Sequence, residues 1–536
     1  MRLIEKELNS PFWAEKGYKG IGYDRERIAE KTRKEPIWVH FGAGNIFRAF
    51  PAMLQHDLIE KGRADKGIIV GEGFDYQIID DIYDKHDNLS LLVTLKSDGT
   101  VEKSIVASIT EAYPFDRSFE KDWERFREIF ISPSLQMATF TITEKGYELK
   151  NENGEYKERY REDFDRGPGE CSMFLSQLLE LLLARFRENA LPIALVSMDN
   201  CSHNGDRFKL ALTTIASKWV DKALVEREFL EYLERSVSYP WTMIDKITPR
   251  PDEAVLDILS SDGVEDMAPL VTDKGTYIAP FVNAEETGYL VMEDDFPNGR
   301  PEFERCGVYI TDRETVDKAE KMKVCTCLNP IHTALSLLGC LLGYDRIYKE
   351  MRDDDIVGVL EGLGYKEALP VASDPKIIDP KAFIDQVFSL RLPNPFIPDS
   401  PWRIARDTSQ KLAIRFGETL KAYKAKGMKL ENLVFIPMVY ALWLRYCLTV
   451  DDFGKAFVPA PDPLLDYIRM HLEKIKLGYD GNLDCLDDIL SNERIFGLDL
   501  VKEGLSGNVK VLFGKMISKI GGVRALIHDL AFIGHI

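Results

Sequence analysis

Apolar residues follow two patterns along the chain, and the first occupies its N-terminal part. Short β-branched and aromatic runs are typical of buried strands, and they lie at 37–41, 67–71, 91–95, 137–141 and 193–197. Between some of these runs, apolar residues recur at helical spacing, as in 46–60 and 171–189. Strands that alternate with helices predict an α/β fold with a largely parallel, doubly wound sheet.

The second pattern begins near residue 310, where long amphipathic segments replace the strand-like runs. They predict helices at 313–328, 331–342, 380–390, 401–426, 433–448 and 463–476. A chain of 536 residues exceeds what one hydrophobic core usually serves. We therefore expect a Rossmann-like domain over 1–310, with 1–36 as an N-terminal extension, and a mostly α-helical domain over 311–536. The boundary is placed to within about 15 residues.

The charge and composition of the chain limit which classes of partner and which cellular location we expect. The net charge of −19 argues against nucleic acid or an anionic membrane, because both select basic surfaces. The N-terminus carries glutamates where a signal peptide needs an apolar run, and the most apolar stretch, 433–444, is too short to span a bilayer. The eight cysteines show no Cys-x-x-Cys pair or zinc spacing. We expect a cytoplasmic protein, a monomer or small homo-oligomer, with a small-molecule substrate and no metal.

The first candidate site is the turn after the first predicted strand, Gly42-Ala43-Gly44-Asn45-Ile46-Phe47-Arg48. Glycines at a strand-to-helix turn let the backbone approach a pyrophosphate, and the helix N-terminus supplies N–H donors. Phe47 stands where the usual dinucleotide fingerprint has its third glycine. A simple glycine turn is therefore the alternative.

Two acids follow the second predicted strand, Glu72 and Asp75. An acid at this place accepts the adenosine ribose hydroxyls and disfavours a 2′-phosphate. The pair therefore favours NAD over NADP as the cofactor. The alternative is that both are solvated loop acids.

Polar residues also follow the strand predicted at 193–197, namely Asp199-Asn200 and His203-Asn204-Gly205. Ligands bind at the carboxyl edge of open parallel sheets, and asparagine there can donate to a developing alkoxide without titrating. An Asx-rich turn is the alternative. Asp245, in Asp-Lys-Ile-Thr-Pro, is a weaker signal because such charge pairs are common on surfaces.

The helical part opens with Lys323 and, after an intervening stretch, Asn329-Pro330. Asn329 and His332 are three residues apart and would share a helix face. A histidine before so apolar a run as 334–342 is otherwise typical of a capping or core position.

A charged stripe is predicted further on. Ser400 is a predicted N-cap with Pro401 at the first helical position, and four charged residues then recur every fourth position, namely Arg403, Asp407, Lys411 and Arg415. The stripe is either a solvated helix face or a cationic wall for a hydroxylated or carboxylated substrate.

Together and in this order, these segments resemble the mannitol dehydrogenase family, the polyol-specific long-chain dehydrogenases, over nearly the whole chain. Gly42, Gly44 and Arg48 resemble the family's Gly-x-Gly-x-x-x-Arg motif. The other matches are Asp199-Asn200 with Asn204-Gly205, Asp245 to Pro249 with Lys246 in place of arginine, and Arg403 with Asp407 and Lys411.

The resemblance implies hydride transfer between a nicotinamide and a secondary alcohol carbon, without a catalytic metal. It implies that Lys323 is the general acid/base, that Asn200 and Asn329 hold the developing oxyanion, and that Asp245 supports the site electrostatically. It also implies substrate contacts from His332, Asn204, Arg403 and Lys411. An amine among apolar walls or other cations suits this proton exchange, because its pKa falls toward neutrality.

One departure from the family concerns spacing. The family usually places the lysine five residues before the asparagine, whereas Lys323 lies six before Asn329. One residue is about 100° on a continuous helix, enough to turn the amine away. Because Pro330 disfavours α conformation at the residue before it, we expect a break or bulge near Asn329 that absorbs the extra residue, with Lys321 as the fallback base.

Among family substrates we favour D-fructuronate, reduced to D-mannonate with NADH. A second cation near Arg403, such as Arg415, Arg250 or Lys246, would hold a carboxylate. Tagaturonate reductase and mannitol 2-dehydrogenase are the alternatives within the family. Outside it stand a non-catalytic dinucleotide-binding sensor and an epimerase with tightly bound NAD.

Overall fold

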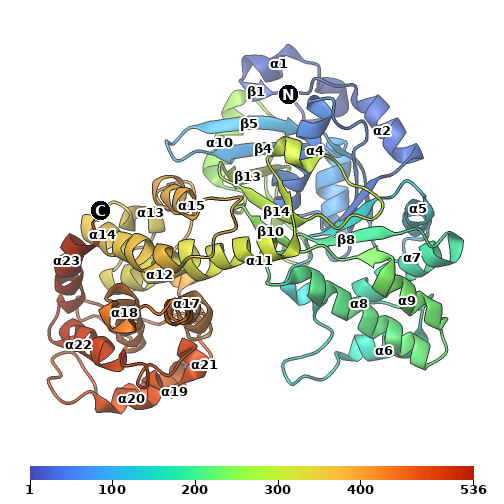
Figure 1. The fold of residues 1–536 in the computed structure, drawn as a ribbon. Coiled ribbons are helices and arrows are strands. Elements are labelled where there is room, and N and C mark those ends of the chain that lie inside the picture. The colour runs from blue at the N-terminus through green and yellow to red at the C-terminus, as the bar shows by residue number, and fades with distance from the viewer. Residues whose placement is uncertain (536) are drawn as a thin grey trace. The chain divides into compact units, whose positions relative to one another are not determined.

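A computed structural model of the chain describes residues 1–535. The chain forms two compact units (Figure 1). The first comprises Met1–Lys96 and Thr100–Asp317, and the second comprises Lys318–Ile536 with Ser97–Gly99.

The first unit is built on a sheet of six strands in the order β6-β3-β2-β7-β8-β9. All neighbouring pairs are parallel. The strands are β2 (Trp38–Phe41), β3 (Ile68–Glu72), β6 (Ile109–Pro114), β7 (Met137–Phe140), β8 (Ile193–Ser197) and β9 (Val237–Ser238). This strand order is that of a doubly wound dinucleotide-binding sheet, so the predicted fold class is confirmed.

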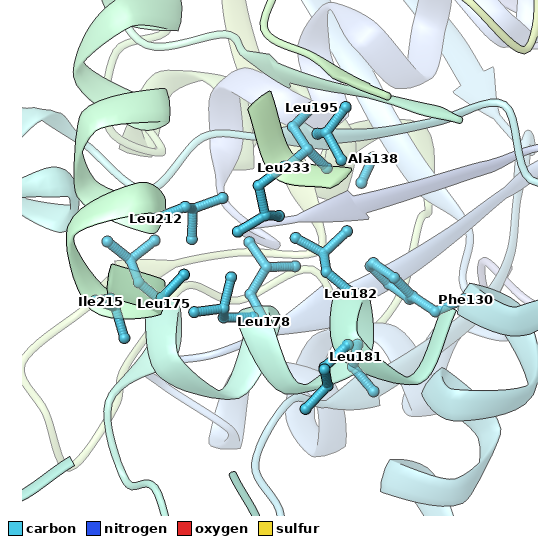
Figure 2. Packing of buried hydrophobic residues seen from close by; sticks show 14 of the residues in the cluster. Phe130, Ala138, Leu175, Leu178, Leu181, Leu182, Leu195, Leu212, Ile215 and Leu233 are labelled. Carbon is cyan, nitrogen blue, oxygen red and sulfur yellow. The ribbon is translucent and has the colours of Figure 1, made fainter. Parts of the chain in front are cut away.

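Helices cover both faces of this sheet. Alternate residues of each strand point to opposite sides, so each strand contributes to two cores. Val39 and Phe41 pack into one apolar core with α5 (Glu120–Ile131), α7 (Phe174–Glu188), α8 (Asn204–Asp221) and α9 (Arg227–Arg235). Figure 2 shows Leu178 and Leu182 of α7 among the side chains of that core. Trp38 faces the opposite core, which α3 (Asn45–Ala49) and α4 (Pro51–Glu60) complete.

Smaller sheets complete the first unit. One has the order β1-β5-β4-β13 and another the order β10-β14-β15, while β11 pairs with β12. Their strands are β1 (Tyr18–Lys19), β4 (Ser90–Leu95), β5 (Val101–Val106), β10 (Thr242–Asp245), β11 (Leu270–Val271), β12 (Tyr277–Ile278), β13 (Phe281–Glu285), β14 (Tyr289–Glu293) and β15 (Tyr309–Thr311). The remaining helices are α1 (Pro11–Glu15), α2 (Arg25–Lys34), α6 (Glu158–Arg166) and α10 (Glu253–Asp262).

Two predictions for this unit need correction. The predicted strand 91–95 is a strand, but it lies in the β1-β5-β4-β13 sheet, and the third strand of the parallel sheet is instead β6, which the apolar pattern missed. The predicted helix 46–60 is broken at Phe50, whose φ of −130° and ψ of −72° are not helical. The break has a local cause, because Pro51 follows and disfavours α conformation at the residue before it.

The second unit is helical. Its helices are α12 (Asn329–Leu342), α13 (Ile347–Glu350), α14 (Asp354–Glu361), α15 (Pro380–Gln386), α16 (Pro401–Ile404), α17 (Glu418–Ala425), α18 (Phe435–Cys447), α19 (Leu465–Leu472), α20 (Asp487–Leu490), α21 (Glu493–Phe496), α22 (Ser506–Ile517) and α23 (Gly522–Gly534), while α11 (Arg313–Lys321) crosses the boundary. α14 and α23 approach so closely that a Cβ at Gly534 would lie 1.9 Å from the Gly358 carbonyl oxygen.

Four segments of the second unit are π-helical: η6 (Met322–Cys327), η7 (Gly362–Ala368), η9 (Val387–Arg391) and η11 (Ala413–Gly417). A π-turn holds one more residue than an α-turn and is frequent at functional sites.

The helix predicted over 401–426 is wrong as a continuous element. It ends at Ile404, and Asp407 has a left-handed conformation with φ of +53°.

The run Arg313–Leu342 is long and apolar enough to cross a membrane by length and composition. Of its most apolar window, 83% is buried inside the protein. Such burial is typical of a core helix.

Candidate functional site

The glycine turn lies between β2 and α3, as predicted. Gly42 has φ of +111°, and a Cβ there would lie 2.4 Å from the Thr141 carbonyl oxygen, so only glycine fits. A Cβ at Gly44 would meet nothing within 4 Å, so there is open space beside the turn. The turn thus leaves the room that a dinucleotide needs at the carboxyl end of a Rossmann strand.

Aromatic and hydroxyl side chains brace this turn from below. Phe47 stacks on His40 with ring centroids 3.9 Å apart. His40 contacts the Thr139 hydroxyl through Nδ1 at 2.6 Å and the Thr141 hydroxyl through Nε2 at 3.0 Å. The Thr141 hydroxyl donates to the Gly42 carbonyl at 3.3 Å, so the Nε2 of a neutral His40 carries the proton. Burial lowers the pKa of His40 to about 3.

Glu72 lies beneath the turn, where loop amides bind its carboxylate. Its Oε2 accepts from the Ala43 amide at 2.8 Å, and its Oε1 accepts from the amides of Phe74 and Asp75 at 2.8 and 3.1 Å. Burial raises its pKa. The Asp75 carboxylate accepts from the Thr272 hydroxyl at 2.6 Å and is also buried. Both carboxylates are buried and hydrogen-bonded within the unit, so the alternative of two solvated loop acids is wrong, and ribose binding stays a prediction.

Arg48 and Phe47 are likewise supports of the turn. The Arg48 guanidinium is buried and donates to the Ala279 carbonyl at 2.8 Å and to the Asn45 side chain at 2.9 Å. Burial lowers its pKa to about 10. With the Phe47 ring packed on His40, the expectation that these two side chains touch the cofactor is corrected. Gly42, Gly44 and Asn45 keep surface exposed at the turn.

The segment after β8 contains one buried support and one exposed amide. Asn204 is fully buried, and its Nδ2 donates to the carbonyls of Asp199 and Thr242, both at 3.1 Å. Its Oδ1 accepts from the Thr242 amide at 3.1 Å. This saturated amide ties β8 to β10, which corrects its predicted role as a substrate contact. Asn200, in contrast, is exposed. Asp245 ends β10 and is buried.

The helical unit contains the predicted bulge. Lys323 lies in the π-turn η6, where the Leu328 amide bonds to the Lys323 carbonyl five residues earlier at 3.2 Å. Leu328 has φ of −126° and ψ of −62°, and α12 begins at Asn329. The N-cap of α12 is thus Leu328. A π-turn absorbs one residue, so the predicted bulge is present, and the role of Lys323 as the acid/base stays a prediction.

His332 lies one turn into α12, where its Nε2 is 3.7 Å from the Asp399 carboxylate. Burial lowers the pKa of His332 to about 4, and among the charges acting on it are Asp399, which raises the pKa, and the guanidinium groups of Arg415, Arg403 and Arg391, which lower it. Arg403 forms an ion pair with Asp399. The imidazole is therefore neutral at neutral pH and surrounded by cations.

Lys411 and Arg415 complete this cationic region, although the predicted stripe on one helix face is wrong. Lys411 donates to the Ile404 carbonyl at 3.0 Å, and Arg415, on η11, donates to the Thr333 hydroxyl at 2.5 Å. Burial, with repulsion from Arg415, lowers the pKa of Lys411 to about 8, and burial lowers that of Arg415 to about 10. The left-handed Asp407 breaks the helix.

Sequence reasoning missed Arg391 and His40. Arg391 is buried at the end of the π-turn η9 and acts on His332, and no spacing rule connects the two. His40 could have been noticed as a histidine inside a buried strand beside the turn. Within residues 1–535, no group of three or more His, Cys, Asp or Glu side chains is placed to hold a metal ion. The metal-free mechanism stays a prediction.

A six-stranded Rossmann sheet with an open glycine turn, joined in one chain to a helical unit that carries a cationic polar cluster, defines a two-domain dehydrogenase. Residues 36–305 match the family model described as the mannitol dehydrogenase Rossmann domain, and residues 315–511 match that of the mannitol dehydrogenase C-terminal domain. The chain therefore belongs to the mannitol dehydrogenase family, whose members are oxidoreductases of CH–OH groups.

Relatives span nearly the full chain. A D-mannonate oxidoreductase of Thermotoga maritima is 47% identical over 97% of this chain and 96% of its own length. The D-mannonate oxidoreductase of Escherichia coli is 27% identical over 88% of this chain and 91% of its own length. The solved structure of a D-sorbitol dehydrogenase has a TM-score of 0.77 at 22% identity, covering 99% of this chain and 100% of that one, which supports the fold.

Proposed function

We propose that this protein is a cytoplasmic, NAD-dependent D-mannonate oxidoreductase that reduces D-fructuronate to D-mannonate. The observation that carries the choice of a sugar acid is the cluster around His332, where the guanidinium groups of Arg415, Arg403 and Arg391 lie near the imidazole together with the Asp399 carboxylate. Arginine binds carboxylates through paired hydrogen bonds. The high identity to the Thermotoga maritima protein supports the same substrate.

The dinucleotide fits the first unit, because Gly42 and Gly44 leave backbone surface and space at the turn. When bound, the nicotinamide supplies the hydride to the ketone carbon or takes it from the alcohol. The choice of NAD no longer depends on Glu72 and Asp75, since both carboxylates are occupied by the loop. It is supported by the solved structure of a mannitol 2-dehydrogenase with NAD, and comparing NADH with NADPH at saturating substrate tests it.

The resemblance to the family assigns the residue roles in the proposed reaction. Lys323 gives a proton to the ketone oxygen as the alcohol forms, and takes it back in the reverse direction. Asn200 and Asn329 donate to the same oxygen as it gains negative charge, without titrating. Asp245 supports the site electrostatically. Because His332 is neutral at neutral pH, it can donate to or accept from a substrate hydroxyl.

Two substrates make the sharpest test, because fructuronate and fructose share the ketone and differ only at the far end, where one carries a carboxylate and the other a CH₂OH. We expect kcat/KM with fructuronate to exceed that with fructose by at least about 100-fold, since a hydrogen bond to a charged group contributes about 1.5–3 kcal/mol and several are available. Equal values would contradict the proposal. Turnover of tagaturonate, an epimer of fructuronate, in preference to fructuronate would instead indicate a tagaturonate reductase.

A matched pair of variants locates the carboxylate. Arg415→Gln should lower kcat/KM for fructuronate by roughly 10–100-fold and change that for fructose by less than about 3-fold. Arg352→Gln removes an exposed arginine of the same unit that packs over Tyr348 and should change neither. A loss with both substrates would show that Arg415 supports the fold and does not read the carboxylate.

The alternative from another class is a non-catalytic sensor. It predicts saturable NADH binding, seen as a change in nucleotide fluorescence, with no turnover of fructuronate, tagaturonate, fructose or fructose 6-phosphate.

Running the same assays with and without EDTA tests the metal-free mechanism. Loss of activity on chelation would overturn it.

A further inference from the structure

The segment after β7 contains a residue in a conformation that its side chain disfavours. Thr143 has φ of +66° and ψ of 160°. Glycine populates this region almost alone, and other residues are held there only when their surroundings compel it. A β-branched residue at positive φ is a genuine outlier. Something must therefore hold Thr143 at the carboxyl edge of the sheet.

The Asp199 carboxylate provides that restraint. Its Oδ1 accepts from the Thr143 amide at 2.9 Å, and its Oδ2 accepts from the Ile142 amide at 3.1 Å and from the Tyr147 hydroxyl at 2.7 Å. The Asp199 side chain is 9% exposed, so water competes weakly for these bonds. Burial raises its pKa, while the three donors lower it.

The restraint joins two neighbouring strand ends. Thr143 follows β7, and Asp199 follows β8, which pairs with β7 in parallel register. The Tyr147 hydroxyl also reaches the Ser197 hydroxyl at 2.9 Å, at the end of β8. Asn200, the proposed oxyanion donor, is the next residue after Asp199. One carboxylate thus fixes both the strained peptide and the peptide that carries the catalytic amide.

From this geometry we infer that Asp199 is a positioning residue of the reaction, which rests on the function proposed above for Asn200. It holds Thr143 in its strained conformation and so fixes the 141–143 segment and Asn200 relative to the nicotinamide end of the cofactor site. The strain has a use, because a relaxed Thr143 would move this edge of the sheet. Asp199 itself contacts no reacting atom in this mechanism.

A double-mutant cycle tests the inference. Asp199→Asn keeps the size but turns an N–H donor toward one of the two amides, and should lower kcat by roughly 10–100-fold while changing the Kd of NADH by less than about 3-fold. Glycine adopts the conformation of Thr143 without strain. Thr143→Gly in the Asp199→Asn background should therefore restore kcat by at least about fivefold.

The chain offers a matched control. Asp163 is buried and accepts from two amides and one hydroxyl, those of Ser172 and Met173, just as Asp199 does, but neither donor residue has positive φ. Asp163→Asn should lower Tm and leave kcat within about twofold. If both aspartate variants lose kcat alike, or if Thr143→Gly restores nothing, Asp199 is only a structural residue and the inference is overturned.

Two further measurements keep the inference testable if Asp199→Asn folds poorly or if the substrate assignment fails. Tyr147→Phe removes a single donor and should lower kcat by about threefold, with recovery by Thr143→Gly. Amide hydrogen exchange needs no substrate, and exchange in the 141–147 segment should accelerate at least tenfold in Asp199→Asn but not in Asp163→Asn. Unchanged exchange would contradict the restraint, whereas absence of turnover in the wild type would contradict only the proposed function.

Discussion

The two units place their candidate residues by opposite means. In the first, all candidates except Asp245, which ends β10 of a smaller sheet, lie at or after the ends of parallel strands, so the turn after β2 and the segments after β7 and β8 share one edge of the sheet. In the second, Lys323, Arg391 and Arg415 lie on the π-turns η6, η9 and η11. The regular sheet defines a site by topology, whereas the helical unit defines one by local departures from the helix.

The largest effect is expected from replacing Lys323, which lies in the π-turn η6. Lys323→Ala should lower kcat by a factor of roughly 10²–10⁴ and leave NADH binding near normal, because it removes the proton-transfer group alone. Single-turnover kinetics with fluorescence titration of NADH measure both. Lys321→Ala is the control, and a greater loss there would show that the π-turn presents the other lysine.

The regular unit is tested through His40. Because its folded pKa is about 3 and that of an unfolded histidine is about 6.5, protonation favours the unfolded state as pH falls below 6.5. Stability is therefore fully present above pH 6.5 and is lost as pH falls toward 3. Between pH 6.5 and 4.5 the wild-type Tm should fall about 3 °C more than that of His40→Gln.

The control for that measurement is His471→Gln, which removes a partly exposed histidine on α19 and should leave the pH dependence of Tm as it is in the wild type. Identical slopes for His40→Gln and the wild type would show that His40 is not held neutral beneath the glycine turn.

A smaller effect is expected for Lys411. Its pKa is about 8, so the ammonium is lost as pH rises through 8 and the KM for a carboxylated substrate should rise about tenfold between pH 7 and pH 9. Lys411→Arg keeps the charge at these pH values and should flatten the profile. A profile unchanged by that substitution would assign the pH dependence to another group.

The smallest effect is expected from deleting Val324. Removing this extra residue should convert η6 to an α-turn. The helices on either side, α11 and α12, should then keep their rotation relative to each other, so kcat should stay within about threefold of the wild type. Deleting Ser336 from the regular, buried α12 puts that helix out of phase and should abolish soluble, active protein. Inactivation by the Val324 deletion would show that the π-turn itself orients Lys323.

The contrast between the units also explains what the sequence could predict. Strand runs and the glycine turn were predicted because each depends on a few adjacent residues, and the bulge was predicted because Pro330 and a spacing anomaly marked it. The roles of Glu72, Arg48 and Asn204 were not, since a polar residue beside a site looks alike whether it faces solvent or is saturated by backbone. Nor could the pattern show that Asp407 breaks the predicted 401–426 helix, because charged residues recur every fourth position there whether or not the backbone is helical.

The π-turn at Met322–Cys327 has a consequence for how such chains are compared with one another. One codon gained or lost there alters a single turn and spares the register of everything downstream, so the gap between Lys323 and Asn329 can differ by one residue between related chains. A search pattern written with a fixed gap would discard this chain as inactive. Patterns for these dehydrogenases should allow the gap to float by one position.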